Sequence, residues 1–280
     1  MRETIIRSLS GIVFIALVSA LCMQQPFYLS LLCMLIVVTG INELYQLIHA
    51  NGIKANFLTK TLRIFFLLFA LLMFGFMAYQ MDALTDNELI ILSLLHLIFL
   101  ILAMVSLYNN LAFKFLVELG PYVLVGLYLI LPAFLWLNSI QHLDAKYNGW
   151  YALGLFVIIW SSDTFAYVWG RLLGKRKLFE SVSPKKTWEG SIGGALSAVL
   201  AALLLAHFTQ IFSYAEISIL TVAVVVFGNY GDLWQSKLKR RAGVKDSGCL
   251  IPGHGGSLDR FDAFLFALGP YTILLNIFLR

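Results

Sequence analysis

The sequence predicts an all-α, polytopic integral membrane protein with about nine transmembrane helices. Of its 280 residues, 60% are hydrophobic and only 12% are charged, whereas soluble domains carry roughly 25% charged residues. Apolar runs that could cross a bilayer recur along the whole chain, and one span needs about 20 such residues. The runs are continuous rather than alternating, which argues against a β-barrel.

The spans are predicted at residues 5–23, 27–48, 62–79, 89–108, 121–137, 151–169, 191–208, 217–233 and 262–279. The first run lacks a small-x-small cleavage site, so we interpret it as a retained helix and not as a signal peptide. The polar connections are too short for a soluble domain, which needs at least about 50 residues. We therefore divide the chain into spans one to five, residues 1–150, and spans six to nine, residues 151–280.

The basic residues predict the orientation of these spans. With the N-terminus in the cytoplasm, every Lys and Arg except Lys146 and Arg280 falls on the cytoplasmic side, as the positive-inside rule requires. The net charge of +5 then gives a basic cytoplasmic face, which suits anionic lipid headgroups. A charge bias that serves only topology is the alternative.

Two carboxylates are predicted inside spans, where an unpaired charge is costly. Asp163 lies in the sixth span and should face a polar cavity, a cation or a metal ion. Glu43 lies at the cytoplasmic end of the second span. It is either a structural partner for a cation or a residue of a functional site.

The loop at residues 174–190 is strongly basic. Ser183 and Pro184 have the residue types of an N-cap and a first helical residue, which predicts a helix beginning there. Lys185 and Lys186 would then lie in its first turn, where cations are disfavoured unless an anion such as phosphate binds. The alternative is a solvated basic loop that binds lipid headgroups without specificity.

The segment at residues 232–262 concentrates charge between two apolar spans. Ser236 follows Asp232 at i+4, on the same helix face. Carboxylate oxygens suit Mg²⁺, while cations and glycine N–H groups suit phosphates. The charges crowd at one membrane face and not at the midplane, where transporter sites usually lie. This chemistry favours phosphoryl or nucleotidyl transfer, which depends on positioning and charge neutralisation.

Part of this segment resembles the signature of the phosphatidate cytidylyltransferases, also called CDP-diacylglycerol synthases. The spacing matches without a gap at Ser236, Leu238, Lys239, Arg240, Lys245, Asp246, Pro252, His254, Gly255, Gly256, Asp259, Arg260 and Asp262. Residues 163–174 and 183–190 also look like a conserved region of this family. One departure is Ser257, at a position that is usually aliphatic.

The resemblance implies that CTP and phosphatidate (phosphatidic acid) react to give CDP-diacylglycerol and pyrophosphate, with Mg²⁺ as the cofactor. A second metal ion or K⁺ is left open. It also implies a homodimer among the lipids of a bacterial cytoplasmic (inner) membrane, with no nucleic-acid partner. Asp232 and Asp259 are the metal ligands that the resemblance indicates, and residues 151–280 are the catalytic region.

We expect two groups of site residues on this basis. The catalytic group is Asp232, Asp246, Asp259, Asp262, Lys239 and His254. The substrate-binding group is Asp163, Lys185, Lys186, Ser236, Arg240, Lys245, Gly255, Gly256 and Arg260. His254 either orients or protonates the leaving group or has a structural role in its loop. Whether Lys185 and Lys186 bind the lipid or the nucleotide is left open.

Three other functions are considered. A CTP-dependent kinase of a lipid alcohol would need a base for a neutral hydroxyl group. A transporter or lipid flippase would move its substrate without cleaving CTP. A structural membrane scaffold would have no need for the paired cations and carboxylates of residues 232–262.

Overall fold

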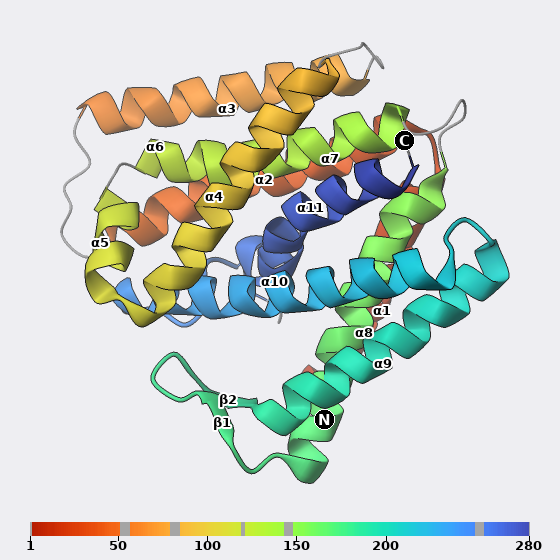
Figure 1. The fold of residues 1–280 in the computed structure, drawn as a ribbon. Coiled ribbons are helices and arrows are strands. Elements are labelled where there is room, and N and C mark those ends of the chain that lie inside the picture. Colours follow the sequence, from red (N-terminus) through yellow and green to blue (C-terminus); the bar gives the residue numbers. More distant parts are fainter. Residues whose placement is uncertain are drawn as a thin grey trace.

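The computed structural model describes residues 2–50, 57–78, 85–118, 121–142, 148–249 and 255–279, and most of them are helical (Figure 1). In chain order the elements are α1 (Arg2–Met23), α2 (Pro26–His49), α3 (Phe57–Ala78), α4 (Asp86–Tyr108), α5 (Asn110–Glu118), α6 (Pro121–Leu124), the π-helix η1 (Val125–Ile130), α7 (Leu131–His142), α8 (Gly149–Leu173), β1 (Lys177–Phe179), β2 (Ser183–Thr187), α9 (Trp188–Thr209), α10 (Tyr214–Arg241) and α11 (Leu258–Leu279).

The prediction of an all-α, multi-pass membrane protein is confirmed. Within the described residues, six helices are long and apolar enough to cross a membrane, namely α2, α4, α8, α9, α10 and α11. Shorter apolar helices at Ser10–Met23 and Val125–Gln141 overlap the first and fifth predicted spans. The count of about nine spans and the cytoplasmic N-terminus stay predictions.

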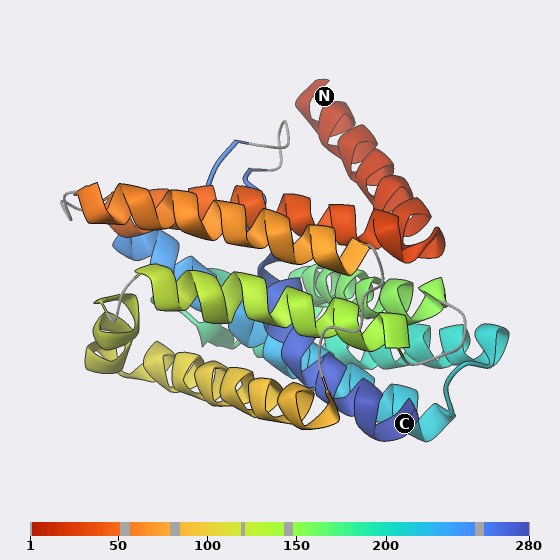
Figure 2. The ribbon, with the colours of Figure 1, turned by 90° about the horizontal axis from the view of Figure 1, so that it is seen from above.

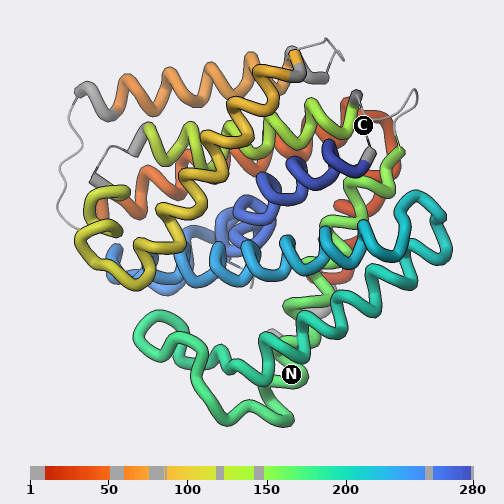
Figure 3. Tube along the Cα trace, viewed as in Figure 1, coloured from red at the N-terminus to blue at the C-terminus, as the bar shows by residue number. Residues whose placement is uncertain are grey.

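The helices form two groups that meet at α10 and α11. Helix α2 packs against α3, and α8 packs along α9 with α1 beside it (Figures 1 and 2). Helices α10 and α11 pack on each other between these groups. The hairpin of β1 and β2 extends from the ends of α8 and α9, below α10 in the view of Figure 3. The charged loops predicted to form the site are therefore close to one another.

The prediction that a helix begins at Ser183 and Pro184 is wrong. These residues begin strand β2, which pairs antiparallel with β1, with Phe179 opposite Ser183. Proline is tolerated near the start of such an edge strand because the N–H that it lacks is not needed for pairing there. Along this strand Lys185 is exposed, whereas Lys186 is partly buried.

Helix α9 begins at Trp188, just after the hairpin. The Thr187 hydroxyl accepts a hydrogen bond of 3.2 Å from the N–H of Gly190, which caps the helix. The Glu189 carboxylate accepts the N–H groups of Lys175 and Arg176 at 3.0 and 3.1 Å. A helix cap and a carboxylate together hold the hairpin against the start of α9.

The contact between α8 and α9 depends on small residues. The buried face of α9 is Gly190, Gly194, Ala198, Ala202 and Ala206. A Cβ atom on Gly194 would lie 2.5 Å from the Ser162 carbonyl oxygen and 2.8 Å from the Ala166 Cβ. The backbones of the two helices are therefore too close for any side chain at this position.

Gly194→Ala is expected to lower the thermal unfolding midpoint of the protein in detergent, because α8 and α9 must separate. Overpacking of this kind typically costs about 1–3 kcal/mol. Gly75→Ala in α3 is the matched control, since its Cβ would meet no atom within 4 Å. Equal midpoints for the two variants would mean that the close α8–α9 contact is not required.

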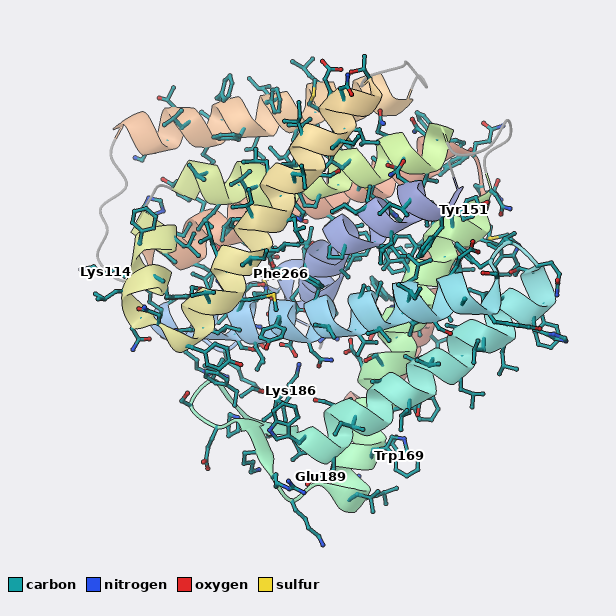
Figure 4. All side chains as sticks on the ribbon, viewed as in Figure 1. Lys114, Tyr151, Trp169, Lys186, Glu189 and Phe266 are labelled. Atoms are coloured by element: carbon teal, nitrogen blue, oxygen red, sulfur yellow. The ribbon has the colours of Figure 1, made fainter. Side chains whose placement is uncertain are left out.

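A buried aromatic cluster holds α10 and α11 in register. The Trp234 ring lies 5.3 Å from Tyr128 of the π-helix and 5.7 Å from Phe266, between centroids. The indole N–H of Trp234 donates to the Ser106 hydroxyl at 3.2 Å, and Figure 4 shows Phe266 in the middle of the molecule. The cluster therefore fixes the helix segments that carry the aspartates of the candidate site.

Candidate active site

Elements far apart in the sequence bring the predicted acidic and basic residues together. Helix α8 supplies Asp163, strand β2 supplies Lys186, and α10 supplies Asp232. Figure 4 shows Lys186 in the space between the hairpin and α10. Helix α11 contributes Asp259 and Asp262 from its first two turns. Because α11 begins at Leu258, these aspartates form an i, i+3 pair on one face of the helix.

The first ion pair joins the hairpin to α10. The Lys186 Nζ atom lies 2.5 Å from the Asp232 Oδ2, and the side chains are 24% and 33% exposed. The Ser236 hydroxyl donates to the Asp232 Oδ1 at 3.3 Å, which confirms the expected i, i+4 contact. Burial lowers the pKa of Lys186, but the Asp232 carboxylate more than offsets this and raises the pKa above its usual value. Lys186 is therefore a cation at neutral pH.

The second ion pair is more deeply buried. The Lys239 Nζ atom lies 2.6 Å from the Asp259 Oδ1, with side chains that are 10% and 7% exposed. The Asp259 Oδ2 accepts the N–H groups of Ser247 and Gly256 at 2.7 and 2.9 Å. Both carboxylate oxygens of Asp259 thus have donors. This residue connects α10, α11 and the loop between them.

The other two aspartates lie close to these pairs. The Asp262 Oδ1 accepts the N–H of Ala263 at 2.8 Å. Asp262 is near enough to Asp232 and Asp163 for the three carboxyl groups to interact electrostatically, and Lys186 interacts with all three. Like charges in a poorly hydrated site repel each other, so the lysines and any further bound cation would stabilise this cluster of carboxylates.

Two pockets open beside this cluster, and Asp163 lines both. One, of about 360 Å³, lies between α1, α8 and α11 and includes Asp259, Arg260 and Asp262. The other, of about 350 Å³, lies between α8, β2, α9 and α10 and includes Arg171, Lys185, Lys186, Asn229 and Asp232. Two ligands could therefore bind next to Asp163, one in each pocket.

Helix α1 is a part of the site that the sequence did not indicate. Ser10, Gly11, Phe14 and Ile15 line the first pocket. Only a serine and a glycine mark this stretch within an apolar helix, so its sequence carries little sign of the role. The apolar wall that α1 provides makes this pocket suitable for an amphipathic ligand.

Some predicted site residues are not brought into these pockets. Among the described residues that line them, Arg240, Lys245 and Asp246 do not occur. The Arg240 guanidinium instead donates to the Val244 carbonyl oxygen at 3.0 Å, and Lys245 and Asp246 are exposed. His254 lies outside the described residues.

The glycines that close the loop have conformational and packing roles. Gly255 has a φ of +83°, which side chains rarely tolerate. Gly256 donates its N–H to Asp259. Neither the positive φ of Gly255 nor the hydrogen bond from Gly256 to Asp259 requires a phosphate. The predicted contacts of these glycines with substrate would be additional to these roles.

Comparison with known proteins supports the resemblance seen in the signature. The family model described as "Cytidylyltransferase family" matches residues 5–278. The phosphatidate cytidylyltransferase of Bacillus subtilis is 34% identical over 271 residues, which cover 96% of this chain and 95% of that protein.

Two staphylococcal relatives match a shorter region more closely. The phosphatidate cytidylyltransferase of Staphylococcus epidermidis is 48% identical over 126 residues, or 45% of this chain and 48% of that protein. The Staphylococcus aureus protein of the same name is 45% identical over equal shares. These matches span about half the length of the two relatives. The full-length family match and the B. subtilis relative nevertheless show that this chain belongs to the cytidylyltransferase family of membrane enzymes.

Proposed function

We propose that this protein is a phosphatidate cytidylyltransferase, which transfers the cytidylyl group of CTP to phosphatidate and releases pyrophosphate. The observation that carries the proposal is the pairing of Asp232 with Lys186 and of Asp259 with Lys239 beside two pockets. The name of the B. subtilis relative, which aligns over 96% of the chain, supports the same activity.

In the proposed reaction, a phosphate oxygen of phosphatidate attacks the α-phosphorus of CTP. The bond between the α-phosphorus and the bridging oxygen breaks, and pyrophosphate leaves with the electron pair. The attacking phosphate is already an anion at neutral pH, so the protein need not supply a strong base. Its main task is to neutralise charge on the phosphates and to align them, which is how such transfers are usually catalysed.

The two pockets suggest a place for each substrate. The pocket beside α1 combines Phe14, Ile15 and Trp160 with the cation of Arg260, which suits a lipid with an anionic headgroup. The pocket beside β2 combines Arg171, Lys185 and Lys186, which suits a triphosphate. Asp163 lines both pockets, so the attacking and attacked phosphates would meet near it.

The donor set fits the proposed Mg²⁺. Asp232 and Asp259 offer carboxylate oxygens, the ligands that Mg²⁺ prefers. Each carboxylate is paired with a lysine ammonium group, which would have to move aside for the metal to bind. Within the described residues, no group of three or more His, Cys, Asp or Glu side chains could hold a metal by itself. Mg²⁺ usually completes its shell with water and substrate phosphates. When bound, it would neutralise phosphate charge and help pyrophosphate to leave.

The assembly and the location are also part of the proposal. We propose a homodimer in the cytoplasmic membrane of a bacterium, with the charged loops facing the cytoplasm, where CTP is found. The basic hairpin and the dense charges of residues 232–262 support this orientation through the positive-inside rule. The bacterial relatives support the choice of membrane.

Pyrophosphate release tests the activity and its metal requirement together. Purified protein should release pyrophosphate only when CTP, phosphatidate and Mg²⁺ are all present, and chelation by EDTA should stop release until Mg²⁺ is restored. Movement of lipid across a vesicle membrane without CTP cleavage would instead support a flippase. Release that continues without a divalent metal would contradict the proposed Mg²⁺ site.

A further inference from the structure

Helix α2, in the N-terminal half, contributes a buried carboxylate to the candidate site. Glu43 is 7% exposed. Its Oε2 accepts the Ser247 hydroxyl at 2.5 Å and the Leu258 N–H at 2.9 Å, and its Oε1 accepts the Ser257 N–H at 2.7 Å. These donors are neutral groups of the loop and of the start of α11. None of these three donors is the cation that was considered as a partner for Glu43.

Glu43 and Asp259 both accept hydrogen bonds from the described residues of the segment between α10 and α11. Ser247 connects them, because its N–H donates to Asp259 and its hydroxyl donates to Glu43. The far end of the loop is held in the same way, through the Gly256 N–H on Asp259 and the Ser257 N–H on Glu43. Two carboxylates thus join both ends of the segment between α10 and α11.

The loop is shaped to receive this carboxylate. A Cβ atom on Gly256 would lie 2.4 Å from the Glu43 Oε2, and one on Gly248 would lie 2.8 Å from the Oε1. The two glycines therefore let the backbone pack directly on the Glu43 carboxylate. A buried carboxylate is stable only when its oxygens receive hydrogen bonds, and close approach of the backbone makes these bonds possible.

We propose that Glu43 is a positioning residue of the active site. Its carboxylate fixes the loop and the first turn of α11, and through them the Asp259–Lys239 pair and Asp262. This inference rests on the proposed cytidylyltransferase activity, because the residues that Glu43 positions are those proposed to bind phosphate and Mg²⁺. Glu43 itself lines neither of the two described pockets, so it acts through the loop.

Glu43→Gln tests the requirement for a carboxylate. The glutamine side chain replaces one carboxylate oxygen with an NH₂ group, which cannot accept a hydrogen bond. At least one of the three hydrogen bonds to Glu43 must therefore be lost. Loss of groups that orient ligands typically reduces activity about 10–100-fold. We expect kcat per folded molecule to fall by this factor, with folded protein measured by size-exclusion chromatography and thermal unfolding.

Glu216→Gln is the matched control. Glu216 also accepts a backbone N–H, from Ser213 at 2.8 Å, and caps α10 at the end remote from the site. Its variant should keep the wild-type kcat. A merely structural role for Glu43 predicts less folded protein with an unchanged kcat per folded molecule, and that result would overturn the proposal.

Ser247→Ala provides a second route if Glu43→Gln does not fold. It removes the hydroxyl that joins the two carboxylates and leaves the N–H bonds of Ser257 and Leu258 on Glu43 in place. We expect kcat to fall about tenfold. Where Glu43→Gln folds, the double variant should be no slower than Glu43→Gln alone, because both changes act on one contact. A wild-type kcat for Ser247→Ala, or independent effects in the double variant, would contradict the proposal. A wild-type protein that releases no pyrophosphate would instead refute the proposed function.

Discussion

Asp259→Asn is expected to reduce turnover about 100-fold or more, within the range found when a preorganised charged contact to a reacting group is lost. The carboxylate holds the Lys239 ammonium group at 2.6 Å and two N–H groups at 2.7 and 2.9 Å. An amide presents an N–H₂ group to one of these donors, so it cannot satisfy all three. It also removes a charge from the proposed Mg²⁺ ligands. The measurement is the rate of CDP-diacylglycerol formation at saturating CTP.

Glu180→Gln is the control for this change, because it removes the same charge from an exposed turn between β1 and β2. Both variants should insert into membranes and elute from size exclusion as the wild type does. Turnover of Asp259→Asn within about twofold of the wild type, a factor worth less than 1.4 kcal/mol, would remove Asp259 from the catalytic machinery.

Lys186→Met is expected to raise the KM for CTP about 10–100-fold and to change the KM for phosphatidate much less. The variant removes a cation from the pocket proposed for the triphosphate and leaves Asp232 without its partner at 2.5 Å. A hydrogen bond to a charged group contributes about 1.5–3 kcal/mol, and each 1.4 kcal/mol is about tenfold in affinity. Initial rates with one substrate varied at a time measure both constants.

Lys175→Met removes the same charge from an exposed position at the base of the hairpin and should leave both KM values near those of the wild type. A rise in the KM for phosphatidate alone in Lys186→Met would assign the pocket beside β2 to the lipid. No change in either constant would mean that Lys186 does not bind a substrate phosphate.

The parts of the site that local patterns determine could be predicted from the sequence. Ser236 lies beside Asp232 because residues at i and i+4 share a helix face, and the structure has this contact. Asp259 and Asp262 mark the start of α11, as the end of the polar segment indicated. Helix content followed from apolar runs long enough to cross a bilayer.

Contacts between distant parts of the chain could not be predicted in this way. The hydrogen bond between Ser247 and Glu43 joins residues 204 positions apart, and a local pattern carries no information on such a pairing. The hairpin was missed because strands of three and five residues show too little alternation, and the serine–proline pair imitates a helix start. Arg240 belongs to the same basic run as Lys239, yet its side chain turns to the Val244 carbonyl.

The position of the label that CTP transfers to lipid tests the proposed reaction most directly. Purified protein is incubated with phosphatidate in mixed micelles, Mg²⁺, and CTP labelled with ³²P at either the α- or the γ-phosphate. The account predicts that the α-label enters the organic-extractable lipid and that the γ-label is recovered only in pyrophosphate. Transfer of the γ-label to lipid would identify a lipid kinase, and absence of both labels from lipid would contradict cytidylyl transfer by this protein.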